Sequence, residues 1–475
     1  MRTAVVVGSG PNGLAAAVHL ARHGVHVQVL ESADSIGGGT RSSELTIPGL
    51  LHDECSALHP MGAGSPFWRQ LDLERYGLRW LRAPIDCAHP VDDGPAALLH
   101  RSVDVTAAGL GVVDGDRWRR LVGGLAAHFD ELAGDVMLPL GRVPRHPLRL
   151  GSFGARAVLP ATVTARLFRT EHARALYGGI AAHAYHRLDR PLTSAVGLLI
   201  AAAGHRYGWP VAEGGSRAIT DALAAMLADL GGSVDTGIRV RTVADVPPAD
   251  VVLLDVAPAQ AVDILGDRVP PRIVRSLRRF RHGPGAFKVD FAVEGGVPWL
   301  DPECERAAMV HLGGTFEEIA AAERAVTAGR MPARPFVLVG QQYVADPGRS
   351  SGNVHPVYSY THVPHGFSGD ATAAVTDRIE RFAPGFRDRV VATAVRGPAE
   401  LAASNVNYVG GDILGGANSP MQVLVRPRTA WNPYRTGVPG VYLCSGSTPP
   451  GGGVHGMCGF NAAEAALRSG ERFSG

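Results

Sequence analysis

The chain has 475 residues, of which 45% are hydrophobic and 19% are charged, and its formal net charge is +2 at pH 7. This composition excludes an intrinsically disordered protein, and the nearly balanced charge argues against nucleic acid as a main partner. Since one hydrophobic core rarely supports so long a chain, we expect two domains.

Cysteine spacing and apolar runs bear on the compartment. The cysteines form no CxxC pair and no metal-like spacing, which predicts reduced thiols, no disulfide framework and no metal site in a cytoplasmic protein. They are Cys55, Cys87, Cys304, Cys444 and Cys458. The first residues show no signal-peptide pattern. The most apolar internal run, Ser194 to Gly204, is about half the ~20 residues that cross a bilayer, so we expect a buried helix there.

Residues 3–32, TAVVVGSGPNGLAAAVHLARHGVHVQVLES, predict a strand, a helix and a second strand of a parallel sheet. Gly8, Gly10 and Gly13 form G-x-G-x-x-G at the turn before the helix, a pattern that lets a pyrophosphate approach the backbone at the helix N-terminus. Glu31 closes the second strand, where a carboxylate binds both ribose hydroxyls and favours a ribose without a 2′-phosphate. This stretch therefore predicts a dinucleotide-binding unit.

Between about residues 50 and 210 the pattern changes to arginine-rich helical stretches broken by prolines, which indicates an inserted domain. Its most basic and amphipathic part runs from Arg142 to Phe168. A segment of this kind could rest on a membrane surface.

The next segments return to the first domain and then leave it again. A helix from about Arg217 to Leu230, a glycine stop and two strands, the second being DVVLLDV, predict further parallel sheet. In GAFKVDFAVEGGVPW, apolar residues alternate with Lys288, Asp290 and Ala292, which predicts a half-buried strand of a different sheet. Lys288 is the only lysine of the chain.

The C-terminal segment carries the most unusual motif. GVYLCSG predicts one more strand, and GSTPPGGGVHGMCGFNAA then places six glycines and two prolines around the start of a closing helix that we expect to end near Ser469. Because this arrangement is costly for the backbone, it indicates that a ligand comes close to the main chain.

Several of these motifs together resemble those of the FAD-dependent phytoene desaturase-like oxidoreductases, and most closely the group of pyridine nucleotide-disulfide oxidoreductase domain-containing protein 2. The motifs are GSGPNG, Glu31, GGGTRS, WPVAEGGSRAI and YLCSGSTPPGGGVHGMCGFNAA. Monoamine oxidases are more distant relatives. The resemblance implies an α/β fold, in which a doubly wound FAD-binding domain, Rossmann-like and of the glutathione reductase type, is interleaved with an α+β substrate domain.

The resemblance also implies cofactor-binding residues in two loops. Gly38, Gly39 and Arg41 of GGGTRS would lie over the dinucleotide. The backbone at Gly452, Gly453 and Val454 would contact the isoalloxazine ring, with the last helix pointing its N-terminus at flavin N1 and the C2 carbonyl.

At two further expected cofactor-binding positions the chain matches the family's motifs less fully. After Gly446 many relatives have an acid that holds the ribityl or pyrophosphate region, whereas this chain has Ser447, whose hydroxyl can still form hydrogen bonds. Val240 matches a strand residue whose backbone usually meets the adenine, and ordinary strand packing is the alternative.

Lys288 and His455 are the candidate catalytic residues. The strand of Lys288 resembles the monoamine oxidase strand whose lysine is bridged by water to flavin N5, and the alternative is a solvent-facing lysine paired with Asp290. His455 would lie in the first turn of the last helix, as a neutral base near the flavin or as a residue that only caps or packs. The candidate pocket walls are His59, Tyr360 and His362.

We expect the FAD-binding domain to comprise residues 1–60, 212–275 and 405–475, and the substrate domain residues 61–211 and 276–404. No second strand-bound G-x-G-x-x-G and no CxxC are present, which argues against NADPH docking and thiol exchange. No cysteine lies between Glu305 and Val441, the region where monoamine oxidases attach flavin, so we expect noncovalent FAD.

Three functions stay open. An amine or alcohol oxidase is favoured by Lys288, and a desaturase of an apolar chain is favoured by the overall resemblance and by the basic stretch, which allows peripheral membrane contact. In either enzyme a small, apolar substrate would give a hydride to flavin N5, and oxygen or a quinone would accept the electrons. The third function is that of a binding protein, since Rab GDP dissociation inhibitors resemble this fold without flavin chemistry. The retained terminal glycine motif argues against it, and the sequence leaves the oligomeric state open.

Overall fold

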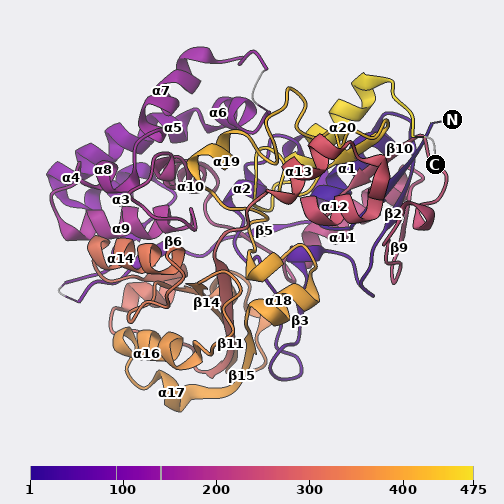
Figure 1. The fold of residues 1–475 in the computed structure, drawn as a ribbon. Coiled ribbons are helices and arrows are strands. Elements are labelled where there is room, and N and C mark those ends of the chain that lie inside the picture. Colours follow the sequence, from indigo (N-terminus) through magenta and orange to yellow (C-terminus); the bar gives the residue numbers. More distant parts are fainter. Residues whose placement is uncertain (1, 93, 140–141, 474–475) are drawn as a thin grey trace.

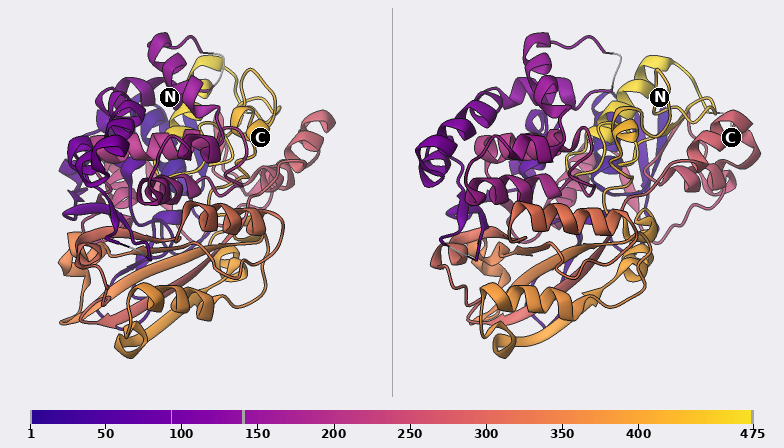
Figure 2. Two further views of the ribbon diagram at one scale, coloured as in Figure 1. Left: turned by 90° about the vertical axis from the view of Figure 1, so that its left-hand side faces the viewer. Right: turned by 60° about the vertical axis from the view of Figure 1, so that its left-hand side comes forward.

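The protein is described by a computed structural model over residues 2–92, 94–139 and 142–473. Two larger sheets and a block of helices make up the fold (Figure 1). The seven-stranded sheet and the helices that cover it form one layer, beneath the helical block and the five-stranded sheet (Figure 2).

The five-stranded sheet is parallel in every pairing and has the order β16, β10, β1, β2, β9. Its strands are β1 (Thr3–Val7), β2 (His26–Leu30), β9 (Ser233–Asp235), β10 (Val251–Leu254) and β16 (Val441–Leu443). In β1, Val5 and Val7 pack in one apolar cluster whereas Ala4 and Val6 pack in another, so the strand is buried on both faces. This explains why its sequence is a continuous apolar run.

Helices cover both faces of this sheet. The first face carries α1 (Pro11–Arg22), α11 (Arg217–Asp229) and α20 (Met457–Ser469), and the other carries α12 (Pro258–Leu265) and α13 (Pro271–Arg278). The doubly wound arrangement expected for the dinucleotide-binding part is thus confirmed. The structure also confirms the expected ends of two helices, since α11 ends one residue before Leu230 and α20 ends at Ser469.

The seven-stranded sheet has the order β15, β11, β14, β13, β12, β6, β7 and is antiparallel except where β6 pairs with β12. Its strands are β6 (Ile85–His89), β7 (Ala97–Leu99), β11 (Gly285–Glu294), β12 (Ala307–Leu312), β13 (Val337–Gly340), β14 (Val354–Val363) and β15 (Val390–Arg396). The two helices α14 (Phe316–Thr327) and α16 (Thr372–Phe382) pack against it.

The expectation that β11 is half-buried is wrong. Every residue of the strand except Glu294 is buried. Phe287 and Phe291 pack in the apolar cluster that includes α16, whereas Lys288 and Asp290 on the other face lie near His52 and Arg396. Alternation of apolar and polar residues therefore reflects a charged internal layer here.

The helical block lies between residues 103 and 207. Its helices are α3 (Val103–Gly109), α4 (Gly111–Trp118), α5 (Gly124–Ala127), α6 (Phe129–Val136), α7 (Pro147–Ala157), α8 (Ala161–Ala165), α9 (Glu171–Ala182) and α10 (Thr193–Tyr207). The apolar run at 194–204 forms most of α10, as predicted. Among the residues described, no helix is both long enough and apolar enough to cross a membrane.

Short elements complete the fold. They are α2 (Pro60–Ala63), α15 (Gln342–Ala345), α17 (Phe386–Arg389), α18 (Pro398–Ser404), α19 (Pro420–Leu424), β3 (Ser42–Ser43), β4 (His52–Asp53), β5 (Trp80–Leu81) and β8 (Val211–Ala212). All five cysteines are free thiols, as expected.

Candidate active site

A cavity of about 1190 Å³ lies where the carboxyl ends of β1, β2 and β10 meet the helical block and the seven-stranded sheet. It is lined by most of the residues that the sequence singled out: Gly8, Gly10, Glu31, Gly38, Gly39, Arg41, His59, Val240, Tyr360, Gly446, Ser447, Gly452, Gly453, Val454 and His455. Three others do not line it, namely Gly13, Lys288 and His362. The fold thus brings motifs from both ends of the chain to one cavity.

The glycine turn brings α1 into direct contact with the sheet. A Cβ on Gly13 would lie 2.0 Å from the carbonyl oxygen of Gly8, so no side chain fits there. The Gly13 amide donates to Asp255 Oδ2 at 2.9 Å. Gly8 itself has φ +104°, which a residue with a side chain rarely adopts. Gly13 therefore packs the helix, and Gly8 and Gly10 face the cavity.

Glu31 is held as an acceptor at the end of β2. The residue is 6% exposed, and its Oε2 accepts from the Ser9 amide at 3.0 Å and from the Ser9 hydroxyl at 2.6 Å. Oε1 accepts from the Ala33 amide at 2.9 Å and from Arg41 Nη2 at 3.3 Å. An ionised carboxylate has about four acceptor sites, and these donors already use them, so a ribose hydroxyl would have to replace one of the longer hydrogen bonds, such as that from Arg41 Nη2 at 3.3 Å.

The GGGTRS loop packs directly over the glycine turn. A Cβ on Gly38 would lie 3.1 Å from the Cα of Gly10, and one on Gly39 would lie 2.3 Å from Tyr408 Oη. Arg41 fixes the loop further, because it donates to the carbonyl oxygens of Ser35 and Ser404 as well as to Glu31. Glycines at these positions leave room for two backbones to approach.

Val240 lies beside this end of the cavity, outside any strand. Strand β9 ends at Asp235, and the chain beyond it continues without regular pairing. The side chain is 9% exposed and packs against the cluster of β1 and β10. The expected strand position is therefore wrong, although Val240 does line the cavity.

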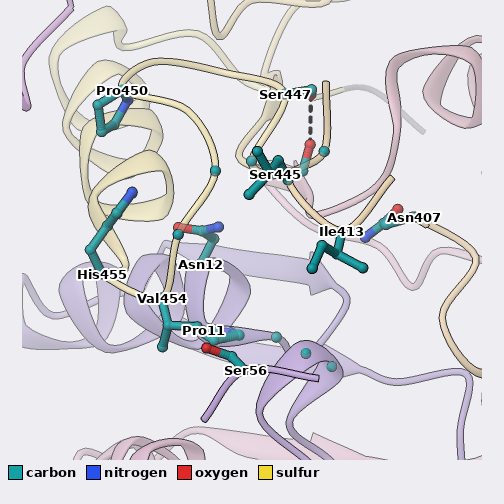
Figure 3. Close-up of a pocket in the computed structure, with 18 of the residues that line it drawn as sticks. Pro11, Asn12, Ser56, Asn407, Ile413, Ser445, Ser447, Pro450, Val454 and His455 are labelled. Atoms are coloured by element: carbon teal, nitrogen blue, oxygen red, sulfur yellow. Dashed lines mark hydrogen bonds between the residues drawn. The ribbon is translucent and has the colours of Figure 1, made fainter. Parts of the chain in front are cut away.

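The terminal glycine run forms a cavity wall that ends beside the start of α1. Residues 445–455 leave β16, loop outward and return beside Pro11 and Asn12 (Figure 3). Ser447 is 2% exposed, and its hydroxyl forms a 2.7 Å hydrogen bond with the hydroxyl of Ser445. Ser445 in turn donates to the carbonyl oxygen of Val256. A hydroxyl pair thus occupies the place where many relatives have an acid.

His455 precedes the last helix instead of lying in its first turn. Helix α20 begins at Met457, and His455 Nδ1 accepts from the Met457 amide at 3.1 Å. Burial lowers the pKa of His455 to about 4, while hydrogen bonding to the carbonyls of Gly451 and Gly452 acts in the opposite direction. The imidazole is neutral, as expected, but its Nδ1 lone pair already caps the helix.

Lys288 faces neither the cavity nor solvent. It is 2% exposed, its Nζ forms an ion pair with Asp290, and it lies 4.3 Å from the centre of the Tyr358 ring. Tyr358 lines the cavity, so the lysine is one side chain behind the wall. Burial lowers the pKa of Lys288, and the charge of Asp290 opposes that shift. The expected pairing with Asp290 is present and the solvent-facing alternative is wrong, whereas the water-bridged approach to flavin N5 stays a prediction.

The three candidate wall residues divide between the cavity and the core. His59 lines the cavity, and its Nε2 lies 2.8 Å from Ser216 Oγ. Burial lowers the pKa of His59 to about 4. Tyr360 also lines the cavity. His362 lies behind it, paired with the buried carboxylate of Glu323 at 2.7 Å.

Asp255 is a cavity residue that sequence reasoning missed. It directly follows β10 and lies against the glycine turn, where Oδ2 is 3.0 Å from the position of a Cβ on Gly10. Burial raises the pKa of Asp255 to about 7, although the Gly13 amide opposes this shift. An acid placed just after a buried parallel strand was the available signal, since ligands bind at the carboxyl ends of such strands.

One group of lining residues carries no charge. We call it the apolar arm, and it comprises the lining residues of segment 183–209 with those of β12 and β14: His183, Tyr185, Leu192, Ala195, Val196, Leu199, Ile200, Trp209, Met309, Tyr358 and Tyr360. Burial lowers the pKa of His183 to about 3, so the imidazole is neutral. No Asp, Glu, Lys or Arg belongs to the arm among the residues that the structure describes.

These features fit a dinucleotide with a flavin end. The side-chain-free turns at Gly8 and Gly10 line the cavity together with Glu31, and Gly452 and Gly453 present bare backbone to the same cavity. A Cβ on Gly452 would lie 2.3 Å from the carbonyl oxygen of Leu414, so the run has no room for side chains. These groups therefore suit a ribose at Glu31, a diphosphate at the glycine turn and a flat ring at the bare backbone.

Comparisons with known proteins agree with this geometry. Residues 6–72 match the model of an NAD(P)-binding Rossmann-like domain. The chain is 26% identical to pyridine nucleotide-disulfide oxidoreductase domain-containing protein 2 of Mus musculus, over 98% of this chain and 93% of that protein. It is 27% identical to hydroxyneurosporene desaturase of Cereibacter sphaeroides, over 98% of this chain and 97% of that protein. The solved structure of cyclohexylamine oxidase from Brevibacterium oxydans has 16% identity and a TM-score of 0.58, over 98% of both chains.

The comparisons confirm the predicted resemblance over nearly the whole chain. The chain is thus related along its length to oxidoreductases, one of which is a desaturase. The structural likeness to an amine oxidase confirms the fold class.

Proposed function

We propose that this chain is an FAD-dependent oxidoreductase that removes a hydride from an apolar small molecule, by desaturation or by oxidation of an alcohol or amine. One observation carries the proposal. A single cavity connects the glycine turn and Glu31, through the bare backbone at Gly452 and Gly453, to the uncharged apolar arm. Such a cavity would place a flavin between its own anchor and an apolar substrate.

Each part of the cavity wall has a role in this proposal. The backbone at the start of α1 would bind the diphosphate, and Glu31 would accept from the ribose hydroxyls. FAD, held noncovalently, would supply the acceptor for the hydride. Gly452, Gly453 and Val454 would contact its ring, while His455 would hold the glycine run and the start of α20 in place.

The apolar arm favours an uncharged substrate and therefore favours desaturation. A charged group entering the arm would lose its hydration without gaining an ionic partner. Amine oxidation had rested on Lys288, which does not line the cavity. Anaerobic bleaching of the flavin against polyenes, alcohols and amines tests this choice. If only amines bleach the flavin, amine oxidation would be favoured over desaturation.

Oxygen or a quinone is the proposed electron acceptor, because the chain carries no second strand-bound G-x-G-x-x-G for a nicotinamide nucleotide. Mixing the reduced protein with air-saturated buffer, or anaerobically with a quinone, separates the two. Rapid reoxidation with peroxide release indicates an oxidase. Reoxidation by quinone alone indicates an enzyme that passes its electrons to a lipid-soluble acceptor.

Peripheral membrane contact forms part of the same proposal. Val143, Leu148 and Trp431 are 91%, 88% and 92% exposed, and residues 142–169 contain six arginines and no acid. Val143 also lines the cavity. Sedimentation with anionic vesicles should carry the protein down, neutral vesicles should carry less, and Leu148→Glu should weaken both effects.

The alternative is a binding protein on the same fold, without redox chemistry. It predicts a purified chain that takes up no FAD yet binds apolar ligands. The cytoplasmic location and the domain boundaries given above stay predictions.

A further inference from the structure

Arg426 is a buried cation that no described carboxylate contacts directly, although the charge of Asp412 acts on it from beyond ion-pair distance. It follows α19, lines the cavity and is 1% exposed. Among the residues that the structure describes, no carboxylate forms an ion pair or hydrogen bond with its guanidinium. Arg349 is equally buried, yet it pairs with Asp53 at 2.6 Å and with Asp346 at 3.0 Å. Arg426 thus differs from a buried arginine that serves only the fold.

The hydrogen bonds of Arg426 go to neutral oxygens and leave one donor over. Nε donates to the Gln422 carbonyl, and Nη2 donates to the Ala417 carbonyl and to Asn418 Oδ1. Nη1 donates only to the Gly446 carbonyl, at 3.1 Å. Since a guanidinium has five N–H donors, one on Nη1 has no acceptor.

That nitrogen lies against the glycine run. A Cβ on Gly451 would be 2.6 Å from Arg426 Nη1, so only glycine leaves space for the guanidinium there. The next two residues, Gly452 and Gly453, line the cavity where the isoalloxazine ring is proposed to lie. Among the residues described, Arg426 forms no hydrogen bond with the glycine turn that would hold the diphosphate, since its hydrogen bonds go to residues 417–446.

We propose that Arg426 supplies the fixed positive charge that stabilises the reduced, negatively charged flavin at its pyrimidine edge. This inference rests on the proposed function. The oxidised ring is neutral and gives the buried charge no partner, whereas reduction creates one in a weakly screened environment. The charge should therefore favour reduction and have little effect on the affinity for oxidised FAD.

The test compares Arg426→Gln and Arg426→Lys with wild type, and uses Arg428→Gln as the matched control from the same loop. Sulfite affinity of the oxidised holoprotein is the first readout, because the sulfite adduct carries negative charge at the same edge. The second readout is the two-electron midpoint potential. Arg426→Gln should bind sulfite at least tenfold more weakly and lower the potential by about 30 mV, the equivalent of tenfold for two electrons. The sulfite affinities of Arg426→Lys and Arg428→Gln should stay within threefold of the wild-type value.

Several results would overturn the inference. If Arg426→Gln binds sulfite within threefold of the wild-type affinity and its midpoint potential is unchanged, the charge effect is excluded. A tenfold loss of affinity for oxidised FAD with an unchanged potential would assign Arg426 to the diphosphate instead. If Arg426→Gln does not fold, the wild-type potential decides, since a value at or below that of free FAD contradicts the inference. A wild-type protein that binds no FAD overturns both this inference and the proposed function.

Discussion

Glu31 is the residue whose environment is most completely built for a ribose. Both of its oxygens are oriented by amides or by Arg41. Glu31→Gln replaces one acceptor oxygen by a donor that opposes the Ser9 amide. Since a hydrogen bond to a charged group contributes about 1.5–3 kcal/mol, we expect FAD to bind at least roughly tenfold more weakly.

Fluorescence titration of the apoprotein with FAD measures this effect. Glu44→Gln is the control, because Glu44 is an exposed acid of the same region. Equal FAD affinities of the Glu31 and Glu44 variants would remove Glu31 from the ribose site.

Lys288 gives a prediction about stability. Replacing it by Met leaves Asp290 buried with only longer contacts, to His52 Nδ1 at 3.7 Å and Arg396 Nη2 at 3.9 Å. Breaking a buried ion pair costs about 3–5 kcal/mol, so the free energy of unfolding in urea should fall by roughly that amount. Lys288→Met with Asp290→Asn should recover part of it. A Lys288→Met variant of normal stability whose flavin reoxidises slowly would instead show that the lysine acts on the cavity.

The sequence predicted some of these residues and not others. Glycines and Glu31 follow local rules of the strand, turn and helix, so their place could be read directly. Lys288 could not be placed, because alternation along a strand does not tell solvent from a second buried layer. Arg426 carried no signal, since its environment comes from residues near 417 and 446 that only the folded loop brings together.

At the scale of elements, the glycine run and α20 act together. His455 caps the helix, and the run contacts the segment before α19 through Leu414. Gly452→Ala would bring its Cβ to 2.3 Å from the Leu414 carbonyl oxygen, so the run must shift from the position in which it lines the cavity.

We expect Gly452→Ala to fold but to retain FAD at least roughly tenfold less well, since about 1.4 kcal/mol of lost contact suffices. FAD content after gel filtration measures this. Gly151→Ala on α7 is the control, because a Cβ there meets nothing within 4 Å. Full flavin retention in the Gly452 variant would place the ring elsewhere.

Elements were predicted best where one pattern determines them. The strand, helix and strand of residues 3–32 agree with β1, α1 and β2 because their apolar period and glycine stops are local. The start of α20 was misplaced by two residues, because its cap is a histidine side chain that sequence rules do not anticipate.

At the scale of the whole molecule, buried neutral histidines predict acid sensitivity. Burial lowers the pKa of His52 and His183 to about 3, and that of His59, His89, His205 and His455 to about 4. Because the unfolded chain binds these protons near pH 6.5 and the folded chain does not, stability is complete above pH 6.5 and falls as the pH drops toward 4.

Each such histidine contributes up to about 1.4 kcal/mol per pH unit in that window. Asp86 and Asp255 act oppositely, because burial raises their pKa values to about 6 and about 7 and the folded state keeps their protons longer. Six histidines outweigh two aspartates, so the free energy of unfolding in urea should fall from pH 6.5 to pH 5.5. A constant or rising value over this interval would contradict the burial of these imidazoles in neutral form.

The whole arrangement, in which both ends of the chain enclose one cavity, followed from sequence only through the resemblance. Pairing of β1 with β10, and of β10 with β16, joins segments far apart in the chain, and no local pattern specifies such partners.

The most direct test of the account is the absorbance spectrum of the purified protein, followed by acid precipitation. The account predicts a yellow protein with one FAD per chain, all of it released into the supernatant. A chain that stays colourless after incubation with FAD, or a flavin that remains with the precipitated protein, would contradict it.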